Sequence, residues 1–283
     1  RRYKKICLST KNKNSYKNTK FVKINLFDKP QVEKLIKKER PEILIHLAWE
    51  TEPKKYLNSK KNLKWLHSSL SLFYFFCKYG GQKAILIGSG LELNFNSKNL
   101  KEEMQLVSDQ KNLNFYNITK ILFHIKAKKI ANYFNKKIIW ARVFWLYGPN
   151  ESSKRLIPTI VKKLNNNKNI FIQDPNKIVN ILHVYDVSKV ISKLIRLNKN
   201  KVVHIADKKN YSIKTLINKT LQYYKNNTSK VVFNNKKNLI TNRYKININY
   251  LNNINFKYKY SIDQGLLEMI NYFKNEKSKY KNQ

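Results

Sequence analysis

Three apolar segments separated by helical patterns constrain the fold of this chain more than any other feature. Residues 42–48 (EILIHLA), 84–90 (AILIGSG) and 137–143 (KIIWARV) are nearly continuous apolar runs, as expected of strands buried on both faces of a parallel sheet. Residues 62–79 and 115–134 lie between them and have the length and apolar character of helices. Strands that alternate with helices in this way predict an α/β fold with a doubly wound parallel sheet and right-handed crossovers.

Further elements extend this pattern toward both ends of the chain. We expect strands at residues 5–10 and 21–25 and a helix at residues 30–40, where Pro30 suits the first turn. Asp186 and Ser212 belong to residue types that cap helices, so we expect each to begin one. After Pro149 the pattern is looser, which indicates a smaller C-terminal lobe. In this part of the chain we expect helices at 155–164, 186–197, 212–224 and 263–273 and strands at 170–172, 179–183 and 202–205.

The composition fits a globular protein that is strongly basic. With 283 residues and a hydrophobic fraction of 42%, the chain can bury a substantial core. The formal net charge is +41, but the lysines are spread over nearly the whole chain and accompany many Asn, Ile, Tyr and Phe residues. All of these have A/T-rich codons, so a biased genome composition accounts for the excess. A surface selected for nucleic acid or another polyanion is the alternative.

The cysteines, the histidines and the apolar runs indicate in which cellular compartment the protein works and whether it binds a metal or a membrane. Two cysteines form no disulfide framework and fit a reducing compartment, which leads us to expect a cytoplasmic protein. Five scattered histidines have no zinc-ligand spacing, so we expect no metal site. The longest apolar run, near residues 70–77, is too short to cross a bilayer, and we expect no membrane partner.

A tyrosine and a lysine four residues apart define the candidate active site. Tyr116 and Lys120 stand at the start of the helix at 115–134, where their side chains share one face, and Ser89 ends the apolar strand before it. A hydroxyl, a phenol and an ammonium brought together can pass a proton to or from a substrate oxygen. The spacing alone is weak, because the chain holds seven such pairs. Tyr116 differs by its setting: an apolar strand ending in Gly88-Ser89-Gly90 lies 27 residues upstream, and a second apolar strand, which runs into Tyr147-Gly148-Pro149, follows its helix. The pairs are Tyr16/Lys20, Tyr56/Lys60, Tyr74/Lys78, Tyr79/Lys83, Tyr116/Lys120, Tyr133/Lys137 and Tyr185/Lys189.

Several motifs in a fixed order resemble the extended short-chain dehydrogenase/reductases, also called the NAD-dependent epimerase/dehydratase family. They run nearly from end to end of the chain, and the stretch 49–65 is similar to a branch of sugar-nucleotide reductases and epimerases. The motifs are the segment 41–48 (PEILIHLA), Ser89, Tyr116-x-x-x-Lys120, Arg142-x-Phe144-x-x-Tyr147-Gly148-Pro149, Leu182-His183-Val184-x-Asp186-Val187 and Ser261-x-x-x-Gly265-Leu266.

The resemblance implies a Rossmann-like fold and a role for each motif. Residues 1–149 with about 178–205 would bind NAD or NADP, and residues 150–177 and 206–283 would form a substrate-binding lobe. Tyr116 would be the general acid/base, and Lys120 would favour its ionised form and bind the nicotinamide ribose. Ser89, Trp145 and Arg155 would contact the substrate. The cofactor would be held by Asn25, Leu26, His46, Leu47, Ala48, Trp49, Lys120, Val143 and Phe144.

The implied function is reduction or epimerisation of a nucleotide-sugar by hydride transfer. A homodimer is implied as well, formed through the helix at 62–79 and the helix that carries Tyr116. Ser9-Thr10-Lys11 offers no acidic residue for a ribose hydroxyl, which tilts the cofactor toward NADP. The alternative is a non-catalytic Rossmann-fold protein that binds RNA or another polyanion, although no gathering of lysines in the sequence supports it. A third reading is a decayed or truncated copy that binds no cofactor.

The chain departs from the family pattern in three places. It begins with Arg1 and holds no glycine-rich turn, so about 30 residues would precede it if it is a βαβ unit without its first part. Asn25 stands where the family usually has Asp, and Val179-Asn180 stands where it usually has Arg-Asp. Among other polar residues, we expect Glu102 and Glu103 to be solvated, His46 to line the core or the cofactor, and His183 to be structural.

Overall fold

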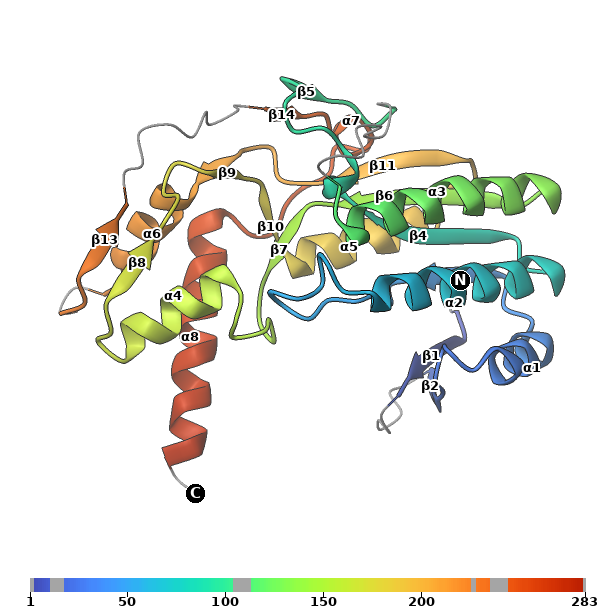
Figure 1. Ribbon diagram of the computed structural model, residues 1–283, viewed down its shortest axis with the longest axis horizontal. Helices are drawn as coiled ribbons and strands as arrows, with labels where there is room; N and C mark the ends of the chain where they lie inside the picture. Colours follow the sequence, from blue (N-terminus) through green and yellow to red (C-terminus); the bar gives the residue numbers. More distant parts are fainter. Residues whose placement is uncertain (1–2, 11–17, 104–112, 225–227, 235–243, 282–283) are drawn as a thin grey trace. The chain divides into compact units, whose positions relative to one another are not determined.

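The computed structural model describes residues 3–10, 18–103, 113–224, 228–234 and 244–281, with side chains up to residue 275 (Figure 1). Contacts between residues group the chain into two compact units. The first unit contains residues 1–86, 111–139 and 198–200, and the second contains residues 87–110, 140–197 and 201–283.

The central four-stranded sheet is built from the apolar segments that the sequence singles out. Its strands are β3 (Ile43–His46), β4 (Lys83–Ser89), β6 (Lys137–Val143) and β11 (Lys201–Ile205), in the order β11-β6-β4-β3. β3 and β4 are parallel, with Ile43 opposite Lys83 and His46 opposite Leu86. β4 and β6 are buried over most of their length, which explains why both read as continuous apolar runs. Both strands begin in the first unit and end in the second.

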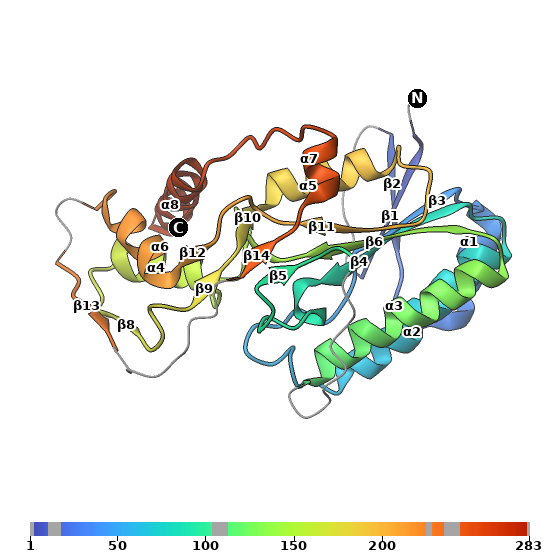
Figure 2. The same ribbon diagram turned by 90° about the horizontal axis from the view of Figure 1, so that it is seen from above.

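Among its described residues, the first unit adds a strand pair and three helices. β1 (Lys5–Ser9) and β2 (Thr19–Lys23) are parallel and form a separate two-stranded sheet. Asp28 caps α1 (Lys29–Glu39) by accepting a hydrogen bond from the Gln31 N–H. α2 (Lys61–Lys78) packs against α1 on one side and α3 (Phe115–Tyr133) on the other, and both ribbon views show α2 beside α3 (Figures 1 and 2). The two helices predicted around the strand β4 are therefore present within one residue of their expected bounds.

The second unit contains short strand pairs and five helices among its described residues. The parallel pairs are β7 (Trp145–Tyr147) with β10 (Ile181–His183), β8 (Ile170–Ile172) with β13 (Val231–Phe233), and β5 (Asn99–Leu100) with β14 (Lys245–Ile246). The antiparallel pair is β9 (Ile178–Val179) with β12 (Tyr211–Ser212). The helices are α4 (Leu156–Asn165), α5 (Val184–Leu194), α6 (Ile213–Leu221), α7 (Asn249–Asn253) and α8 (Ile262–Lys281), and a short 3-10 helix covers Gly90–Glu92.

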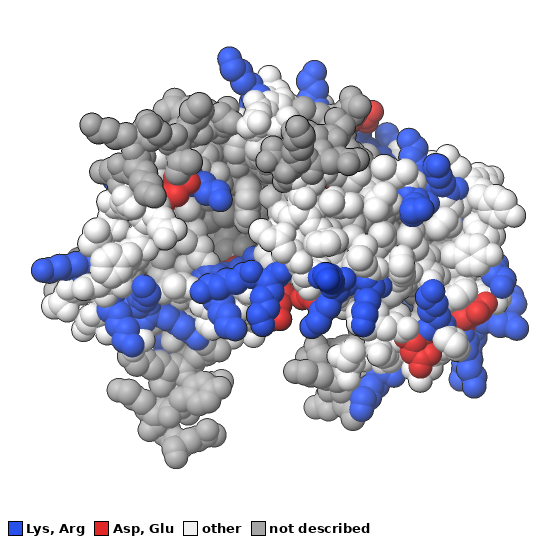
Figure 3. Space-filling model, viewed as in Figure 1, with Lys and Arg blue, Asp and Glu red and all other residues white. Residues whose placement is uncertain are grey.

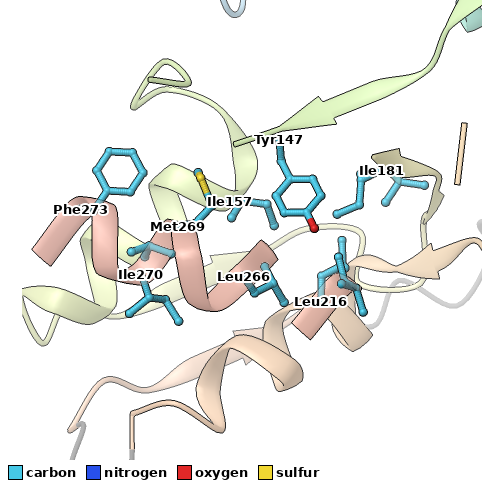
Figure 4. Packing of buried hydrophobic residues seen from close by; sticks show 11 residues of the cluster. Tyr147, Ile157, Ile181, Leu216, Leu266, Met269, Ile270 and Phe273 are labelled. Atoms are coloured by element: carbon cyan, nitrogen blue, oxygen red, sulfur yellow. The ribbon is translucent and has the colours of Figure 1, made fainter. Parts of the chain in front are cut away.

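Apolar side chains of α4, α6 and α8 form the core of the second unit around Tyr147. Gly265 of α8 lies directly against Tyr147, and a Cβ atom built on this glycine would come within 2.7 Å of the ring carbon that carries the hydroxyl. The glycine therefore lets the helix approach the tyrosine. The residues of this core include Tyr147, Ile157, Ile181, Leu216, Leu266, Met269, Ile270 and Phe273 (Figure 4).

Several predictions about the second unit were wrong in detail. The strand expected at 179–183 is two strands interrupted at Asn180. Asp186 does not cap α5, because it lies within the helix and its carboxylate accepts hydrogen bonds from the N–H groups of Lys259 and Tyr260. His183 is the N-cap residue instead. α5 and α6 end earlier than expected, and α8 extends beyond residue 273 to Lys281.

The two cysteines lie in different surroundings. Cys77 on α2 is 2% exposed, and burial raises the pKa of its thiol to about 12. Cys7 on β1 is partly exposed. Within the described residues, no helix is both long and apolar enough to cross a membrane. No group of three or more His, Cys, Asp or Glu side chains in this part of the chain is arranged to hold a metal.

Candidate active site

The start of α3 brings the predicted tyrosine and lysine together. Asn114 caps the helix by accepting a hydrogen bond from the Asn117 N–H at 3.0 Å, and this fixes the first turn. Tyr116 and Lys120 follow one helical turn apart. Lys120 is only 4% exposed, and its Nζ lies 5.9 Å from the centre of the Tyr116 ring. The ammonium is therefore held near the phenol and away from water.

The segment between β3 and α2 packs on this helix start. The Lys120 Nζ lies 3.9 Å from the centre of the Trp49 ring, which is close enough for a cation–π interaction. The Trp49 indole N–H donates to the Asn62 side-chain oxygen at 3.0 Å. The Tyr116 N–H donates to the Leu57 carbonyl oxygen at 2.9 Å, and the Tyr56 ring meets the Tyr116 ring edge-on. Nothing in the sequence pattern indicated these contacts.

The residues that follow β3 combine a buried imidazole with an exposed apolar side chain. His46 is buried against the ring of Phe123, and burial together with the positive charge of Lys120 lowers its pKa to about 3. The imidazole is therefore neutral at physiological pH. Its Nε2 has no hydrogen-bond partner among the described residues. Leu47 is 62% exposed, and Ala48 is partly exposed.

The other predicted cofactor residues of the first unit lie just after β2. Asn25 is exposed, and its side-chain oxygen accepts a hydrogen bond from the Phe27 N–H at 3.1 Å. Leu26 is partly buried, and its carbonyl oxygen accepts a hydrogen bond from the Ser68 hydroxyl on α2 at 2.7 Å. The turn after β2 is thus anchored to α2.

Ser89 is held in the second unit by a buried carboxylate. The Ser89 N–H donates to Glu92 Oε1 at 2.7 Å, and the Ser89 hydroxyl oxygen accepts from the Leu91 N–H at 3.2 Å. Glu92 Oε2 also accepts from the Trp140 indole N–H at 2.9 Å and from Arg142 Nε at 3.0 Å. The hydroxyl accepts this hydrogen bond with one of its two lone pairs, so its proton takes no part in the contact with Leu91. Sequence reasoning missed Glu92, although Ser-x-x-Glu is a capping-box signature.

The expectation that Glu102 is solvated was wrong. Glu102 is 5% exposed, and its carboxylate accepts a hydrogen bond from the His204 N–H at 3.0 Å. Arg142 donates to the Glu102 carbonyl oxygen at 2.9 Å. Burial raises the pKa of Glu102, and burial beside Arg142 lowers the pKa of His204 to about 3. Glu103 is exposed, as expected.

The remaining predicted site residues of the second unit begin with Val143, which ends β6. Val143 and Phe144 are buried, and the Phe144 N–H donates to the Ile205 carbonyl oxygen at 3.3 Å. Trp145 is partly exposed and packs against Phe95, with 5.7 Å between ring centres. Arg155 stands at the N-terminus of α4 and is partly exposed.

Asn180, which stands where the family usually has the aspartate of Arg-Asp, holds a loop. Its side-chain amide donates to the carbonyl oxygens of Asp207 and Lys209 and to the side-chain oxygen of Asn210, at 2.9 to 3.1 Å. Its own side-chain oxygen accepts from the Asp207 N–H at 2.8 Å. The side chain is thereby committed to contacts within the second unit.

The buried His183 contacts two partly exposed polar residues. Its Nε2 lies 2.7 Å from a carboxylate oxygen of Glu268, and the Tyr260 ring lies over the imidazole at 4.0 Å between centres. The Tyr260 hydroxyl donates to the other Glu268 oxygen at 2.8 Å. Burial lowers the pKa of His183, and the Glu268 charge opposes this shift. These contacts fit the structural role predicted for the histidine.

Among the charged side chains on the face that one view shows (Figure 3), basic ones predominate. On the face drawn in Figure 3, Lys and Arg far outnumber Asp and Glu and occur in several separate places. This agrees with a chain of 58 Lys and Arg residues and 17 Asp and Glu residues.

Comparison with known proteins places these residues in a family. A sequence profile of the NAD dependent epimerase/dehydratase family matches residues 1–206. A dTDP-D-glucose 4,6-dehydratase of Dictyostelium discoideum is 26% identical over 192 residues, which make up 63% of this chain and 44% of that protein. The match thus spans less than half the length of this relative.

Solved structures resemble the whole fold. RMD of Pseudomonas aeruginosa, complexed with NADPH, has a TM-score of 0.78 at 16% identity, covering 93% of this chain and 92% of that one. UDP-glucose 4-epimerase of Thermotoga maritima, with UDP-glucose, has a TM-score of 0.77 at 18% identity, covering 96% and 91%. The dTDP-glucose 4,6-dehydratase of Bacillus anthracis, in complex with NAD, has a TM-score of 0.75 at 20% identity, covering 92% and 81%. These likenesses confirm the predicted Rossmann-like α/β fold. Since the profile match covers well over half of the chain, the protein belongs to the NAD-dependent epimerase/dehydratase family.

Proposed function

We propose that this protein is an NAD(P)-dependent enzyme that acts on a nucleotide-sugar, by reduction of a keto group or by epimerisation through hydride transfer. The observation that carries the proposal is the burial of Lys120 beside Tyr116 on one helix face. Lysines are rarely buried without a role for their charge. In the other pairs whose tyrosine is described, the lysine is either exposed or, in the case of Lys83, lies on a strand.

Two features after β3 support binding of a dinucleotide. The buried His46 Nε2 without a partner and the exposed Leu47 next to it suit a ligand that is partly polar and partly apolar. When bound, the nicotinamide ring accepts or donates the hydride. The residues proposed to hold the dinucleotide are Asn25, Leu26, His46, Leu47, Ala48, Trp49, Lys120, Val143 and Phe144.

Three side chains would handle the substrate proton. The Tyr116 phenol gives or takes a proton at the reacting sugar oxygen, and the Lys120 charge favours the ionised phenol. The Ser89 hydroxyl would donate a hydrogen bond to that oxygen, since its contact with the Leu91 N–H uses a lone pair and not the proton. His46 is not a candidate acid, since its burial keeps it neutral.

The lobe residues would select the nucleotide-sugar. We assign substrate binding to a lobe of residues 150–177 and 206–283, which includes Arg155. Trp145, at the start of β7, would contribute from outside the lobe. A guanidinium is suited to bind phosphate oxygens. Arg155 is assigned this contact because the Asn180 amide already donates to oxygens of Asp207, Lys209 and Asn210.

The cofactor is proposed to be NADP rather than NAD. Ser9 ends β1 without a following acidic residue, so no carboxylate there would bind a ribose hydroxyl. Lys11 lies outside the described residues. Fluorescence titration with NADPH and NADH compares the two directly.

The helix pair α2 and α3 is proposed to form a homodimer with a second copy. Apolar side chains stay exposed along both helices, notably Leu63 at 41%, Tyr74 at 40%, Ile125 at 43% and Tyr133 at 83%. Exposed apolar groups on adjacent helices are typical of an interaction surface. Sedimentation that shows a monomer at high concentration would count against this assembly.

The decisive experiment for the function replaces Tyr116 by Phe. Turnover of UDP-glucose or dTDP-glucose should be lost, while binding of the dinucleotide, measured by fluorescence, should persist. Tyr133→Phe is the matched control, because Tyr133 belongs to the same helix and begins another Tyr-x-x-x-Lys pair but is 83% exposed. Unchanged turnover in Tyr116→Phe would refute the proposed acid/base role.

A further inference from the structure

We propose that Trp49 and Asn62 form a clamp that positions Lys120, and this inference rests on the proposed function of Lys120 beside Tyr116. All of these residues belong to the first unit. The clamp consists of the indole face of Trp49, which lies 3.9 Å from the Lys120 Nζ, and the Asn62 side chain, which holds the indole N–H. Trp49 and Asn62 are thus positioning residues, distinct from the side chains that would touch substrate.

The indole face compensates the ammonium for its loss of water. Lys120 is 4% exposed and Trp49 is 7% exposed, so the contact is almost completely removed from solvent. A cation over an aromatic face is attracted to the negative face of the ring, most strongly for tryptophan and most strongly when desolvated. The ring therefore favours one position for the Lys120 Nζ.

Asn62 prevents the indole from rotating away. Its side-chain oxygen accepts the Trp49 N–H at 3.0 Å, and its NH2 group donates to the carbonyl oxygens of Tyr56 at 2.6 Å and Ser59 at 2.9 Å. Asn62 is fully buried, so a rotation of its amide would leave several polar groups without partners. The amide oxygen thus holds the indole, and the NH2 group holds the backbone of Tyr56 and Ser59.

The segment between β3 and α2 also contacts Tyr116. The Leu57 carbonyl oxygen accepts the Tyr116 N–H at 2.9 Å, and the Tyr56 ring contacts the Tyr116 ring edge-on at 5.0 Å. Since the Asn62 amide donates to the Tyr56 carbonyl, one buried side chain fixes the surroundings of both members of the pair. The clamp thereby sets the position of the ammonium relative to the phenol.

A purely structural role for Trp49 makes a different prediction. Trp49 also packs against Phe123, with 5.5 Å between ring centres, so it contributes to the core. If packing were its whole role, Trp49→Phe and Trp49→Leu would change stability alone. If the ring face holds the ammonium, the reactivity of the Lys120 amine should increase as position 49 changes from Trp to Phe to Leu.

Competitive acetylation of lysines in the full chain, read by mass spectrometry, tests the clamp without any substrate. In Trp49→Leu the acetylation rate of Lys120 near neutral pH should rise on the order of tenfold, and the midpoint of its pH profile should fall by about one unit. Trp49→Phe should show a smaller rise. The exposed Lys128 of the same helix is the internal standard. Trp65→Leu is the matched control, because Trp65 contacts Phe27 instead.

The outcomes separate the clamp from the function. Equal Lys120 rates in wild type, Trp49→Phe and Trp49→Leu, with circular dichroism showing folded protein, would overturn the clamp. If Trp49→Leu fails to fold, Trp49→Phe decides, since it keeps an apolar ring. If the Trp49 variants leave the Lys120 acetylation rate unchanged while Tyr116→Phe loses turnover, the clamp alone is refuted. If the Trp49 variants raise that rate while Tyr116→Phe keeps its turnover, the proposed function is refuted and the clamp is supported.

Discussion

Glu151 offers the sharpest test of the electrostatics in the second unit. It follows the Gly148-Pro149 turn, and one of its carboxylate oxygens is buried without a partner among the described residues. Burial raises its pKa to about 7, although the Arg155 charge and the Gly148 N–H pull in the opposite direction. Between pH 4.5 and about 7 the folded protein therefore holds a proton on Glu151 that the unfolded chain releases.

The size of the effect follows from the shift. The folded pKa of about 7 exceeds the reference of 4.5 by roughly 2.5 units, and each unit is worth about 1.4 kcal/mol. Because the folded protein binds more protons than the unfolded chain between these two values, stability is lost as the pH rises from 4.5 to 7. The loss of unfolding free energy attributable to Glu151 should reach about 3 kcal/mol near pH 7 and should not grow at higher pH.

Urea unfolding of wild type and Glu151→Gln between pH 4 and pH 8 measures this loss. The glutamine resembles the protonated carboxyl, so the variant should gain about 3 kcal/mol relative to wild type across that range. His46 and His204 contribute in the opposite sense, since their lowered pKa makes stability rise with pH up to about 6.5, but they are present in both proteins. Glu42→Gln at an exposed position controls for the loss of one negative charge. Stability curves of wild type and Glu151→Gln that remain parallel would refute the reasoning.

Three further substitutions test the packing of the second unit by chemical denaturation. Glu92→Gln leaves the buried Arg142 charge without its partner and should destabilise by roughly 3–5 kcal/mol; a loss below 1 kcal/mol would contradict the buried ion pair. Gly265→Ala forces a methyl group against Tyr147 and should cost about 1–3 kcal/mol, so an unchanged midpoint would argue against that close approach. Ser212→Ala removes the cap of α6 and should cost about 1 kcal/mol, whereas Ser212→Thr should retain most of it.

The central strands and helices could be predicted because their burial is nearly uniform. β6 (Lys137–Val143) has the bounds expected from its apolar run, since a strand covered on both faces needs apolar residues at successive positions. The helices α2 and α3 differ from expectation by one residue at their ends. In these elements the pattern along the chain and the packing in space carry the same information.

Polar residues with distant partners could not be predicted in this way. Ser212 caps α6 as expected, because its partner is the N–H three residues later. Asp186 has the same capping propensity but accepts hydrogen bonds from residues 73 and 74 positions away. Glu102 accepts from His204, 102 positions away. A local pattern contains no information about such partners, so both acidic residues were misjudged.

In the candidate site, too, contacts between residues close in sequence could be predicted, and contacts between distant residues could not. The helical period places Tyr116 and Lys120 on one face, and the resemblance to the family singles this pair out from the others. The contact of Trp49 with Lys120 and the hydrogen bond from Trp49 to Asn62 arise from the course of the chain between β3 and α2. No spacing rule anticipates them. The roles of all these residues stay predictions that the experiments above address.

The contrast between the two cysteines gives the protein a natural attachment point. Amine reagents would modify a chain with so many lysines in many places at once. A thiol reagent at neutral pH would be excluded from Cys77 by burial and by its high pKa, and would react with Cys7 on β1. A fluorophore or spin label can therefore be installed on the first unit of the unmodified sequence, at a single defined strand.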